Sequence, residues 1–547
     1  MKEFKLVILL LIVSSRLALS QDQSTLQRPK LVVGIVVDQM RWDYLYRYYD
    51  RYSEKGFKRM LTTGFSNENT YINYLPSVTA IGHTTVYTGS VPAIHGITGN
   101  DMIMEQTGQG VYCTEDTTVQ GIGVSGKKGQ MSPKNLLVST VTDELKLATN
   151  FRSKVIGIAI KDRGSILPAG HFADAAYWFG PEAAWVSSNY YMADLPKWVK
   201  DFNHRKSAAN YLKNGWSPLY PLSTYVQSSV DDNPYEGTMD GMDRPTLPIS
   251  AAILKKNGLS VIRDTPFGNT YTLDFAKEAI QQEQLGHNSA MVPDFLAVSL
   301  SSTDGIGHQY GVNALEVEDM YLRLDQDLAN FFHFLDQEVG EGQYTVFLTA
   351  DHGASHNNPF FIDHKGAGGY MPKSIGLDSL NQQLKAAFGQ APLINSLANY
   401  QVHLNHSLIN KHKLDEKAIR RHLISLLGEA VGVNYAVDMD EVTSSTLIQP
   451  LRERVVNSYH RARSGVIQLI PQPQWKGGGP NQTGTGHGTW NPYDTHIPLV
   501  WMGWGITHGS SNIPVNMSDI APTISALLHI QEPNGNIGKP IHALLHP

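Results

Sequence analysis

Five short apolar runs, rich in Val and Ile, constrain the fold of this chain more than any other feature of its sequence. The runs cover residues 31–37, 155–160, 294–300, 344–350 and 497–502. Continuous apolar runs of this length are typical of strands buried on both faces of a largely parallel sheet. Segments with apolar residues at helical spacing alternate with them, at 271–285, 315–337 and 519–529. The alternation predicts an α/β core, in which helices cover both faces of a mostly parallel central sheet.

The chain is longer than a typical single domain, so the core is expected to carry insertions or to be divided. Of its 547 residues, 41% are hydrophobic and 17% are charged, which is typical of a globular protein. We expect one domain over residues 21–547, with inserted cap regions at about 170–260 and 365–480. The first insertion is rich in aromatic residues, among them Tyr177, Trp178, Phe179, Trp185, Tyr190, Tyr191 and Trp198. We favour a packing role for them over a wall for a substrate site, because most aromatic side chains serve packing.

The N-terminal 20 residues have the pattern of a secretory signal peptide. Lys2 and Lys5 precede an apolar run over 6–13, and Ala18-Leu19-Ser20 places small residues before a cleavage site at Gln21. The run is far shorter than the roughly 20 residues that span a bilayer, and no Cys follows it as a lipid attachment point. We therefore expect an exported protein, periplasmic or secreted, without a membrane anchor.

The charge and cysteine content argue against a nucleic-acid-binding protein, a disulfide-bonded fold and a thiol enzyme. The whole chain has a formal charge of −6, and removal of residues 1–20, with three cationic and one anionic residue, gives −6 − 2 = −8. A negative balance disfavours nucleic acid as a partner. Cys113 is the only cysteine, so no intrachain disulfide can form. We interpret it as a packing residue and not as a catalytic thiol.

Aspartate and histidine residues gather where the predicted strands end. Asp38, Asp304 and Asp351 each come at or just after the C-terminal end of an apolar run, the edge at which open α/β sheets build their sites. Three histidines accompany them in the motifs DGIGH, ADHG and GTGHG: His308, His352 and His487. A single Asp or His is usually structural, but six together are hard to explain in that way. Carboxylate and imidazole are ligands for Zn²⁺, so the set predicts two metal ions.

Four further residues could act on an anionic substrate beside these metals. Thr79 precedes a predicted helix, where a Thr is often only an N-cap, but metal coordination would activate its hydroxyl as a nucleophile. Lys161 and Arg163, in the sequence KDRG after a predicted strand, place two cations on one side of the chain. With Asn100, which follows a Gly-rich turn, they could hold the oxygens of a phosphoryl group. A solvated loop pair is an equally good interpretation of the two cations taken alone.

The order of these residues resembles the alkaline phosphatase superfamily, and most closely its phosphate-irrepressible (PafA-type) branch of exported bacterial monoesterases. The motifs run from VVDQMRWDYL to GTGHGT in the order Asp, Thr, Asn, Lys-x-Arg, Asp-x-x-x-His, Asp-His, His. The resemblance implies an alkaline-phosphatase-like catalytic domain over residues 21–547. It also implies one Zn²⁺ on Asp38, Thr79, Asp351 and His352, and a second on Asp304, His308 and His487.

By the same resemblance, Thr79 is the residue that is phosphorylated and then hydrolysed, and Asn100, Lys161 and Arg163 contact the phosphoryl oxygens. The implied substrates are small phosphate monoesters, and inorganic phosphate is the product. A phosphodiesterase of the nucleotide pyrophosphatase type remains an alternative, separated by the Lys161–Arg163 pair. A sulfatase is disfavoured because Cys113 lacks the context of a formylglycine precursor. An exported binding protein without activity, or metals used only for folding, also remains open, as does the oligomeric state, a monomer included.

Overall fold

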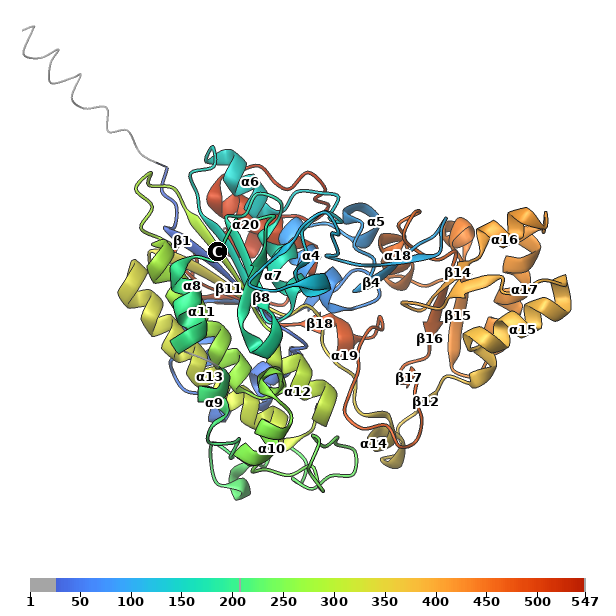
Figure 1. Ribbon diagram of the computed structural model, residues 1–547, viewed down its shortest axis with the longest axis horizontal. Coiled ribbons are helices and arrows are strands. Elements are labelled where there is room, and N and C mark those ends of the chain that lie inside the picture. The colour runs from blue at the N-terminus through green and yellow to red at the C-terminus, as the bar shows by residue number, and fades with distance from the viewer. Residues whose placement is uncertain (1–25, 206–207, 546–547) are drawn as a thin grey trace, which may run out of the picture.

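The computed structural model describes residues 26–205 and 208–545, so the predicted signal peptide lies outside the described residues. Within these ranges the core is a ten-stranded mixed sheet with helices packed around it (Figure 1). The parallel centre of the sheet consists, in spatial order, of β11 (Tyr344–Thr349), β1 (Leu31–Val37), β10 (Asp294–Leu300), β7 (Val155–Ala159) and β8 (Ala175–Phe179). Every residue of β1, β7, β10 and β11 is buried, as the apolar runs predict. The predicted α/β fold is confirmed.

Shorter strands flank this centre and are mostly antiparallel. On one side lie β19 (Leu499–Gly503), β2 (Phe65–Asn67) and β20 (Gly509–Ser511), and on the other lie β9 (Trp185–Ser188) and β6 (Gly121–Ile122). The run at 497–502, expected to be parallel to the others, forms β19 and runs antiparallel to β11. The long segment between β11 and β19 leaves and re-enters the core at the same edge of the sheet. Because the chain returns to the edge that it left, the next strand has to run in the opposite direction.

Two groups of helices enclose the sheet (Figure 1). One group contains α4 (Thr79–Thr88), α6 (Val141–Ala148), α7 (Asp162–Ala169) and α20 (Ile520–Leu528), which contact one another. The other contains α3 (Phe57–Thr63), α11 (Phe267–Glu283), α12 (Ser302–Tyr310) and α13 (Leu315–Leu335). The helices expected at 271–285, 315–337 and 519–529 correspond to α11, α13 and α20. None of the helices in the described part of the chain is both long and apolar enough to cross a lipid bilayer.

The aromatic segment at 170–260 begins inside the central sheet, since β8 and β9 belong to it. Trp178 and Trp185 are buried, and the Trp185 ring stacks on Phe275 of α11 with centroids 4.3 Å apart. These aromatics pack the core, as the sequence favours. The remainder of the segment contains α8 (Lys197–Arg205), α9 (Ala208–Leu212), α10 (Ala251–Lys256) and a loop over residues 226–249. We propose that the inserted segment begins after β9, because β8 and β9 are part of the central sheet.

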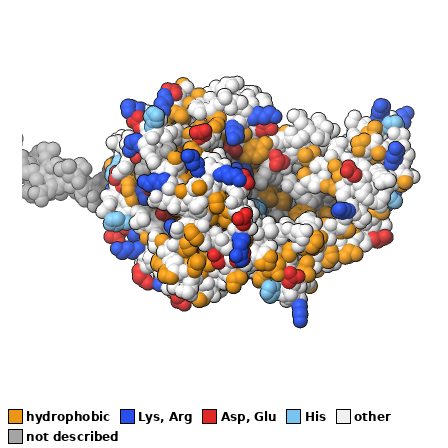
Figure 2. Space-filling view, turned by 60° about the horizontal axis from the view of Figure 1, so that its bottom comes forward, with side chains coloured by type: hydrophobic (Ala, Val, Ile, Leu, Met, Phe, Trp, Pro, Cys, Tyr) orange, Lys and Arg blue, Asp and Glu red, His pale blue; other side chains and the backbone are white. Residues whose placement is uncertain are grey.

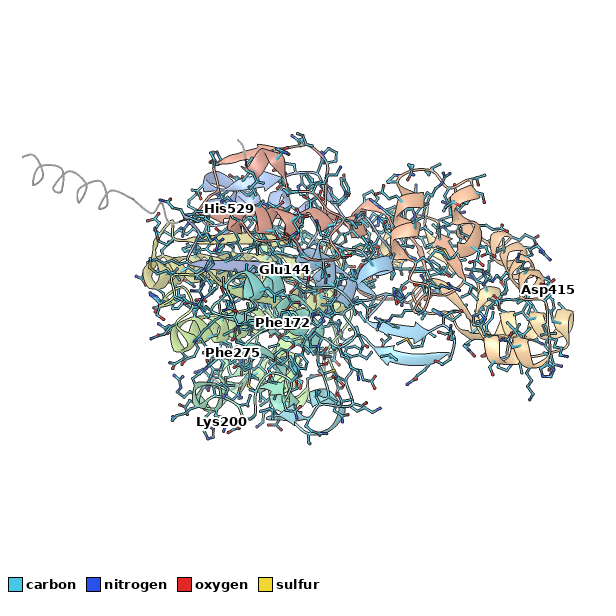
Figure 3. All side chains as sticks on the ribbon, turned by 90° about the horizontal axis from the view of Figure 1, so that it is seen from above. Glu144, Phe172, Lys200, Phe275, Asp415 and His529 are labelled. Carbon is cyan, nitrogen blue, oxygen red and sulfur yellow. The ribbon has the colours of Figure 1, made fainter. Side chains whose placement is uncertain are left out.

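The second expected insertion contains a separate lobe, beside the sheet in Figure 1. Its four-stranded sheet is built from β13 (Ile394–Ser396), β14 (Gln401–Leu404), β16 (Ile467–Pro471) and β15 (Val433–Asp438). Three helices pack on it with an apolar core of their own: α15 (Leu377–Phe388), α16 (His406–Lys411) and α17 (Glu416–Gly428). Asp415, at the start of α17, is labelled at the end of this lobe in Figure 3, whereas Phe275 lies in the main body. In the space-filling view, the surface is recessed between the main body and this lobe (Figure 2).

Candidate metal and catalytic site

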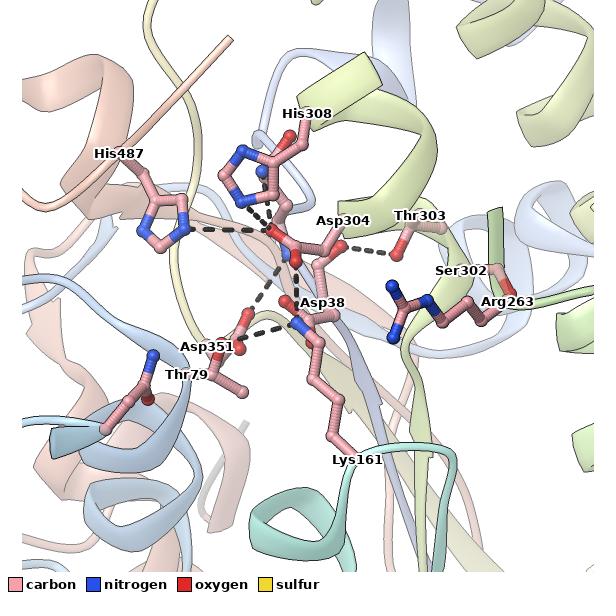
Figure 4. Close-up of polar contacts among 12 residues, drawn as sticks. Asp38, Thr79, Lys161, Arg263, Ser302, Thr303, Asp304, His308, Asp351 and His487 are labelled. Carbon is pink, nitrogen blue, oxygen red and sulfur yellow. Dashed lines mark hydrogen bonds and ion pairs between the residues drawn. The ribbon is translucent and has the colours of Figure 1, made fainter. Parts of the chain in front are cut away.

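The register of the central strands brings the predicted site residues to one edge of the sheet. Val36 of β1 pairs with Ser299 of β10 and Thr349 of β11, so the three strands end together. Asp38 follows β1, Asp304 lies in the first turn of α12 after β10, and Asp351 follows β11. His308 lies one turn further along α12, His352 follows Asp351, and His487 comes from the loop before α19 (Pro492–Thr495). These six residues span 450 positions of the sequence; all of them except His352 are labelled around one point in Figure 4, and His352 Nε2 lies 3.6 Å from Asp38 Oδ1.

Two subsets are close enough to share an ion. The ligand atoms of Asp38, Asp351 and His352 lie within 4.8 Å of one another, and so do those of Asp304, His352 and His487. His308 Nε2 lies 3.0 Å from Asp304 Oδ1, beside the second subset. The geometry separates two neighbouring centres, and His352 lies between them in this structure.

The hydrogen bonds of the three histidines fix which ring nitrogen faces the carboxylates. Nδ1 lies 2.9 Å from the Thr485 carbonyl in His308 and 2.8 Å from the Ser77 carbonyl in His487. In His352 it lies 3.0 Å from the carbonyl oxygen of the next residue. A carbonyl only accepts, so each Nδ1 carries a proton, and Nε2 is the nitrogen that presents a lone pair when the ring is neutral. This arrangement is typical of metal-binding histidines.

Buried atoms without hydrogen bonds mark the first centre. Asp38 Oδ1, Asp351 Oδ2 and His352 Nε2 are inaccessible to solvent and have no hydrogen-bond partner among the described residues. All three side chains are fully buried. Leaving such atoms unpaired is costly, whereas a cation would satisfy all three together. The donor set therefore fits a metal ion of the kind that carboxylate and imidazole ligands bind.

The Lys161 ammonium links the carboxylates of the two centres. Its Nζ lies 2.6 Å from Asp38 Oδ2 and 2.6 Å from Asp304 Oδ2. Burial opposes ionisation of Asp304, but the charges of Lys161 and His308 outweigh it and hold the pKa of that carboxyl well below its usual value. Burial and the neighbouring Asp38 carboxylate raise the pKa of Asp351 well above its usual value. One ammonium does not balance this group of carboxylates, and further positive charge would stabilise all of them as anions.

Thr79 lies beside this charged group and does not cap its helix. It is the first residue of α4, and the N-cap position is occupied by Val78, whose side chain makes no capping hydrogen bond. Thr79 Oγ1 is buried and lies 3.4 Å from Lys161 Nζ. Asn100 Oδ1 accepts a hydrogen bond from the amide of Ala80 at 2.9 Å, which satisfies one of the free donors at the start of α4. The helix N-terminus also favours an anion next to Thr79.

Arg163 lies in the first turn of α7, for which Lys161 is the N-cap residue. Its Nη1 donates to the Tyr112 hydroxyl at 2.9 Å, and Tyr112 in turn donates to Asp162 at 2.9 Å. Arg163 makes no ion pair with the metal-centre carboxylates in the described structure, so its charge remains available to another anion. A pocket of about 410 Å³ opens next to Lys161, Asp304 and His308.

The chain is similar to known proteins. The model of the type I phosphodiesterase / nucleotide pyrophosphatase family matches residues 32–495. The chain belongs to this family. It is thus a member of the alkaline phosphatase superfamily, and the resemblance seen in the sequence motifs is confirmed.

Individual relatives match this family member over almost its full length. A protein of Myroides odoratus named calcium-transporting ATPase is 60% identical over 94% of both chains. Alkaline phosphatase PafA of Elizabethkingia meningoseptica is 48% identical over 97% of both chains. The crystal structure of wild-type PafA superposes with a TM-score of 0.92 at 48% identity, and the match covers 95% of this chain and 100% of that one.

Two polar residues of the candidate site, Gln39 and His83, were not predicted from the sequence. The amide of Gln39 donates to Asp351 Oδ1 at 3.1 Å and its side chain donates to Asp304 Oδ1 at 2.6 Å, with a φ of 64° that is unusual for a residue other than Gly. His83 lies one turn after Thr79, with Nδ1 3.4 Å from Asp351 Oδ2 and Nε2 2.8 Å from Ser299 Oγ. Burial lowers the pKa of His83 to about 4. Their adjacency to Asp38 and Thr79 is the signal that could have identified them.

Proposed function

We propose that this protein is an exported metal-dependent phosphatase that transfers the phosphoryl group of a monoester to Thr79 and then to water. Its class, a phosphate monoester hydrolase, follows from 48% identity to an alkaline phosphatase over nearly the whole chain and from the match to the PafA structure. The observation that carries the detailed proposal is the position of the Lys161 ammonium. It lies between the carboxylates of the two candidate metal centres and next to the Thr79 hydroxyl.

We assign Asp38, Asp351 and His352, with Thr79, to one Zn²⁺ and Asp304, His308 and His487 to the other. The unpaired atoms of the first group and the Nε2 lone pairs of all three histidines support this assignment. When bound, such ions would supply Lewis acidity, which lowers the pKa of a coordinated hydroxyl and stabilises charge on a departing oxygen.

The residues of the chain itself would bind and orient the phosphoryl group. Thr79 is presented at the N-terminus of a fully buried helix, so its hydroxyl is held in one place. Lys161 approaches from the N-cap of α7, and Arg163, held by Tyr112, follows two residues later. Fixed cations act on the developing charge without having to reorganise, which is the main protein contribution to phosphoryl transfer.

The same two cations favour a monoester over a diester. A phosphate monoester presents more anionic oxygen than a diester, and a pair of cations matches that charge better. The matched family includes phosphodiesterases, so family membership alone does not separate the two activities. Lys161 and Arg163 are the residues on which we base the distinction.

We also propose that residues 1–20 direct export and are removed before Gln21, so that the active enzyme is periplasmic or secreted. The positive start, apolar run and small residues of this segment support the proposal. N-terminal sequencing of the protein recovered from outside the cytoplasm should give Gln21 as the first residue. A cytoplasmic product that begins at Met1 would contradict it.

A kinetic panel with the purified, zinc-loaded enzyme tests the function. The substrates are a chromogenic phosphate monoester, the matching diester, the matching sulfate ester and ATP. We expect the highest kcat/KM for the monoester and two zinc ions per chain by elemental analysis. A diester preference would assign the chain to the phosphodiesterases, and no turnover with both metals bound would identify a binding protein.

A further inference from the structure

Two glutamates are buried without a cationic partner at the end of α12, apart from the site described above. Glu236 belongs to the loop over 226–249, and Glu316 lies in the first turn of α13. Glu316 is 0% exposed and Glu236 5%. Both oxygens of Glu316 and Oε2 of Glu236 are inaccessible to solvent and have no hydrogen-bond partner among the described residues. No ion pair involves either glutamate within those residues.

Backbone hydrogen bonds hold the loop against the connection between α12 and α13. Ser229 N donates to the carbonyl oxygen of Asn313 at 2.7 Å, and Gly237 N donates to that of Gln309 at 2.8 Å. Within the loop, the two donors lie on either side of Glu236, and the two acceptors, Gln309 and Asn313, lie just before Glu316. Glu236 is therefore fixed over the start of α13, where Glu316 is also fixed.

Other oxygen groups face the same place. The hydroxyl of Tyr310, the last residue of α12, is also buried and has no hydrogen-bond partner in the described ranges. Tyr310 follows Gln309, whose carbonyl oxygen accepts the hydrogen bond from Gly237 N, so it lies beside the loop at Glu236. Asp231, in the same loop as Glu236, lies near enough to both glutamates to affect their titration.

The neighbouring acids differ from this pair because each has a cation. Glu318 Oε1 is 2.6 Å from Arg51, and Asp319 Oδ2 is 2.7 Å from Arg323. Burial and the neighbouring carboxyls raise the pKa of both Glu236 and Glu316. Two buried carboxyls without a countercharge are strongly destabilising as anions. They require either bound protons or a bound cation.

We propose that Glu236 and Glu316 form the centre of a second metal site, which binds a hard divalent cation, Ca²⁺ in particular, and braces the 226–249 loop. Carboxylate, hydroxyl and carbonyl oxygens are the ligands that Ca²⁺ prefers, and its flexible coordination suits a site assembled from a loop and a helix start. Histidine and cysteine, which select zinc, take no part in this group. The Tyr235 carbonyl of the loop also accepts a hydrogen bond from Gly484 N at 2.8 Å. The next residue, Thr485, holds His308, so the loop supports the segment that orients a candidate zinc ligand.

Ca²⁺ binding to the full-length, zinc-saturated protein tests the proposal without using activity as the readout. The protein is dialysed against calcium-free buffer that contains Zn²⁺, and CaCl₂ is then added. We expect equilibrium dialysis to show one Ca²⁺ bound per chain, and thermal unfolding to show a midpoint that rises with the CaCl₂ concentration. Zinc remains in excess throughout, so the zinc centre does not take up the added calcium.

Variants locate the ion. Glu316→Gln and Glu236→Gln should each weaken Ca²⁺ binding by about tenfold or more, because each removes one ligand charge. Asp243→Asn is the matched control, since Asp243 is an exposed acid of the same loop and its loss should leave Ca²⁺ affinity unchanged. If either glutamine variant fails to fold, the measurement on the unmodified protein still decides. The absence of Ca²⁺ binding and of any midpoint shift in that protein at millimolar CaCl₂ would overturn the proposal and leave a shared proton between the carboxyls.

Discussion

At the scale of single residues, charge and protonation determine what the site can do. Lys161 is shared by Asp38 and Asp304 at equal distances of 2.6 Å, and it is also the cation beside Thr79. Arg163 is held by a neutral hydroxyl instead. We therefore propose different tasks for the two cations. Lys161 would balance the carboxylates of the candidate metal centres, whereas Arg163 would keep its charge for the substrate.

Removal of the Thr79 hydroxyl should abolish catalysis without loss of the fold. We predict that Thr79→Ala lowers kcat for a monoester by at least about 10³-fold, because it removes the hydroxyl that lies 3.4 Å from Lys161 Nζ and that we propose as the nucleophile. Thr84→Ala is the control, since its hydroxyl donates to the Ala80 carbonyl within the helix and should be dispensable for chemistry. Steady-state kinetics at saturating zinc measures both. Equal activity in Thr79→Ala and the unmodified enzyme would refute a nucleophilic role.

Replacement of the two cations should affect monoesters more than diesters. We predict that Arg163→Ala lowers kcat/KM for a monoester by about 10²-fold and for the matching diester by about tenfold or less, because the monoester has more charge to stabilise. Lys161→Ala should follow the same order, with an added loss of zinc affinity due to its contacts with Asp38 and Asp304. Equal losses on both substrates would reject the assignment of the pair to the phosphoryl oxygens.

At the scale of elements, one hairpin connects the site with the lobe. Asn100 comes just before β4 (Asp101–Met104), and Tyr112 ends β5 (Gln109–Tyr112). Glu105, in the turn between them, is buried against the lobe, where it contacts His403 at 2.7 Å and His406 at 2.9 Å. Asn100 and Tyr112, which bind the Ala80 amide and Arg163, lie at one end of the hairpin. The other end, at Glu105, is anchored on the lobe.

The Glu105 contact predicts a pH-dependent stability. The hydrogen bond that His406 donates to Glu105 raises the pKa of His406 above 6.5. Burial opposes ionisation of Glu105, but His403 and His406 outweigh it and lower the pKa of Glu105 below 4.5. The contact therefore contributes most between these two ordinary values. Its contribution is lost as pH rises through the raised pKa of His406, and also as pH falls through the lowered pKa of Glu105.

Chemical denaturation of the unmodified protein and of Glu105→Gln over a pH series measures this contribution. We expect the unmodified protein to be more stable by about 1 kcal/mol near pH 5.5, with a difference that shrinks at higher pH. Other titrating pairs, such as His171 with Asp143, are present in both proteins and cancel in the difference. A difference that is constant with pH would show that the charge of Glu105 makes no contribution.

A close approach of α4 to the sheet edge makes Gly82 irreplaceable. A Cβ at Gly82 would lie 2.4 Å from the Asp351 carbonyl oxygen. We predict that Gly82→Ala destabilises the protein by about 1–3 kcal/mol and lowers activity, because the helix that carries Thr79 has to move away from Asp351. Gly428→Ala in α17 is the control, since nothing lies within 4 Å of its Cβ position. An unfolding midpoint unchanged in Gly82→Ala would contradict this packing.

At the scale of the whole molecule, the fold concentrates negative charge that it does not balance by itself. Asp38, Asp304 and Asp351 are all buried at one sheet edge, and a single ammonium contacts two of them. A sheet edge at which several strands end is a good place for a site, but such a density of buried carboxylate is costly without cations. The stability of the entire domain should therefore depend on bound metal.

Metal removal should thus lower stability as well as activity. We predict that treatment with a chelator lowers the unfolding midpoint and abolishes monoester hydrolysis, and that Zn²⁺ restores both. Zinc at 100 times its dissociation constant would contribute about 2.7 kcal/mol. Calorimetry with and without zinc measures the shift, and Asp351→Asn should reduce it. A metal-free protein with an unchanged midpoint would argue against the assigned ligands.

The sequence alone determined the elements and their chemistry. The apolar runs defined β1, β7, β10 and β11 almost to the residue, because a strand buried on both faces tolerates few polar side chains. The order of the Asp, Thr, Asn, Lys and His motifs indicated the family through its resemblance to the alkaline phosphatase superfamily, because these residue types suit metal binding and phosphoryl transfer.

Tertiary structure decided what depends on distant pairing. β19 is antiparallel to β11 because the chain, after passing through the lobe, re-enters the sheet at the edge where β11 ends. No local sequence pattern encodes that point of re-entry. The roles of Gln39 and His83, the docking of Glu105 on the lobe and the unpaired burial of Glu236 beside Glu316 arise from contacts between distant segments. Side-chain type fixes which bonds a residue can make, but only the folded chain fixes which partners are within reach.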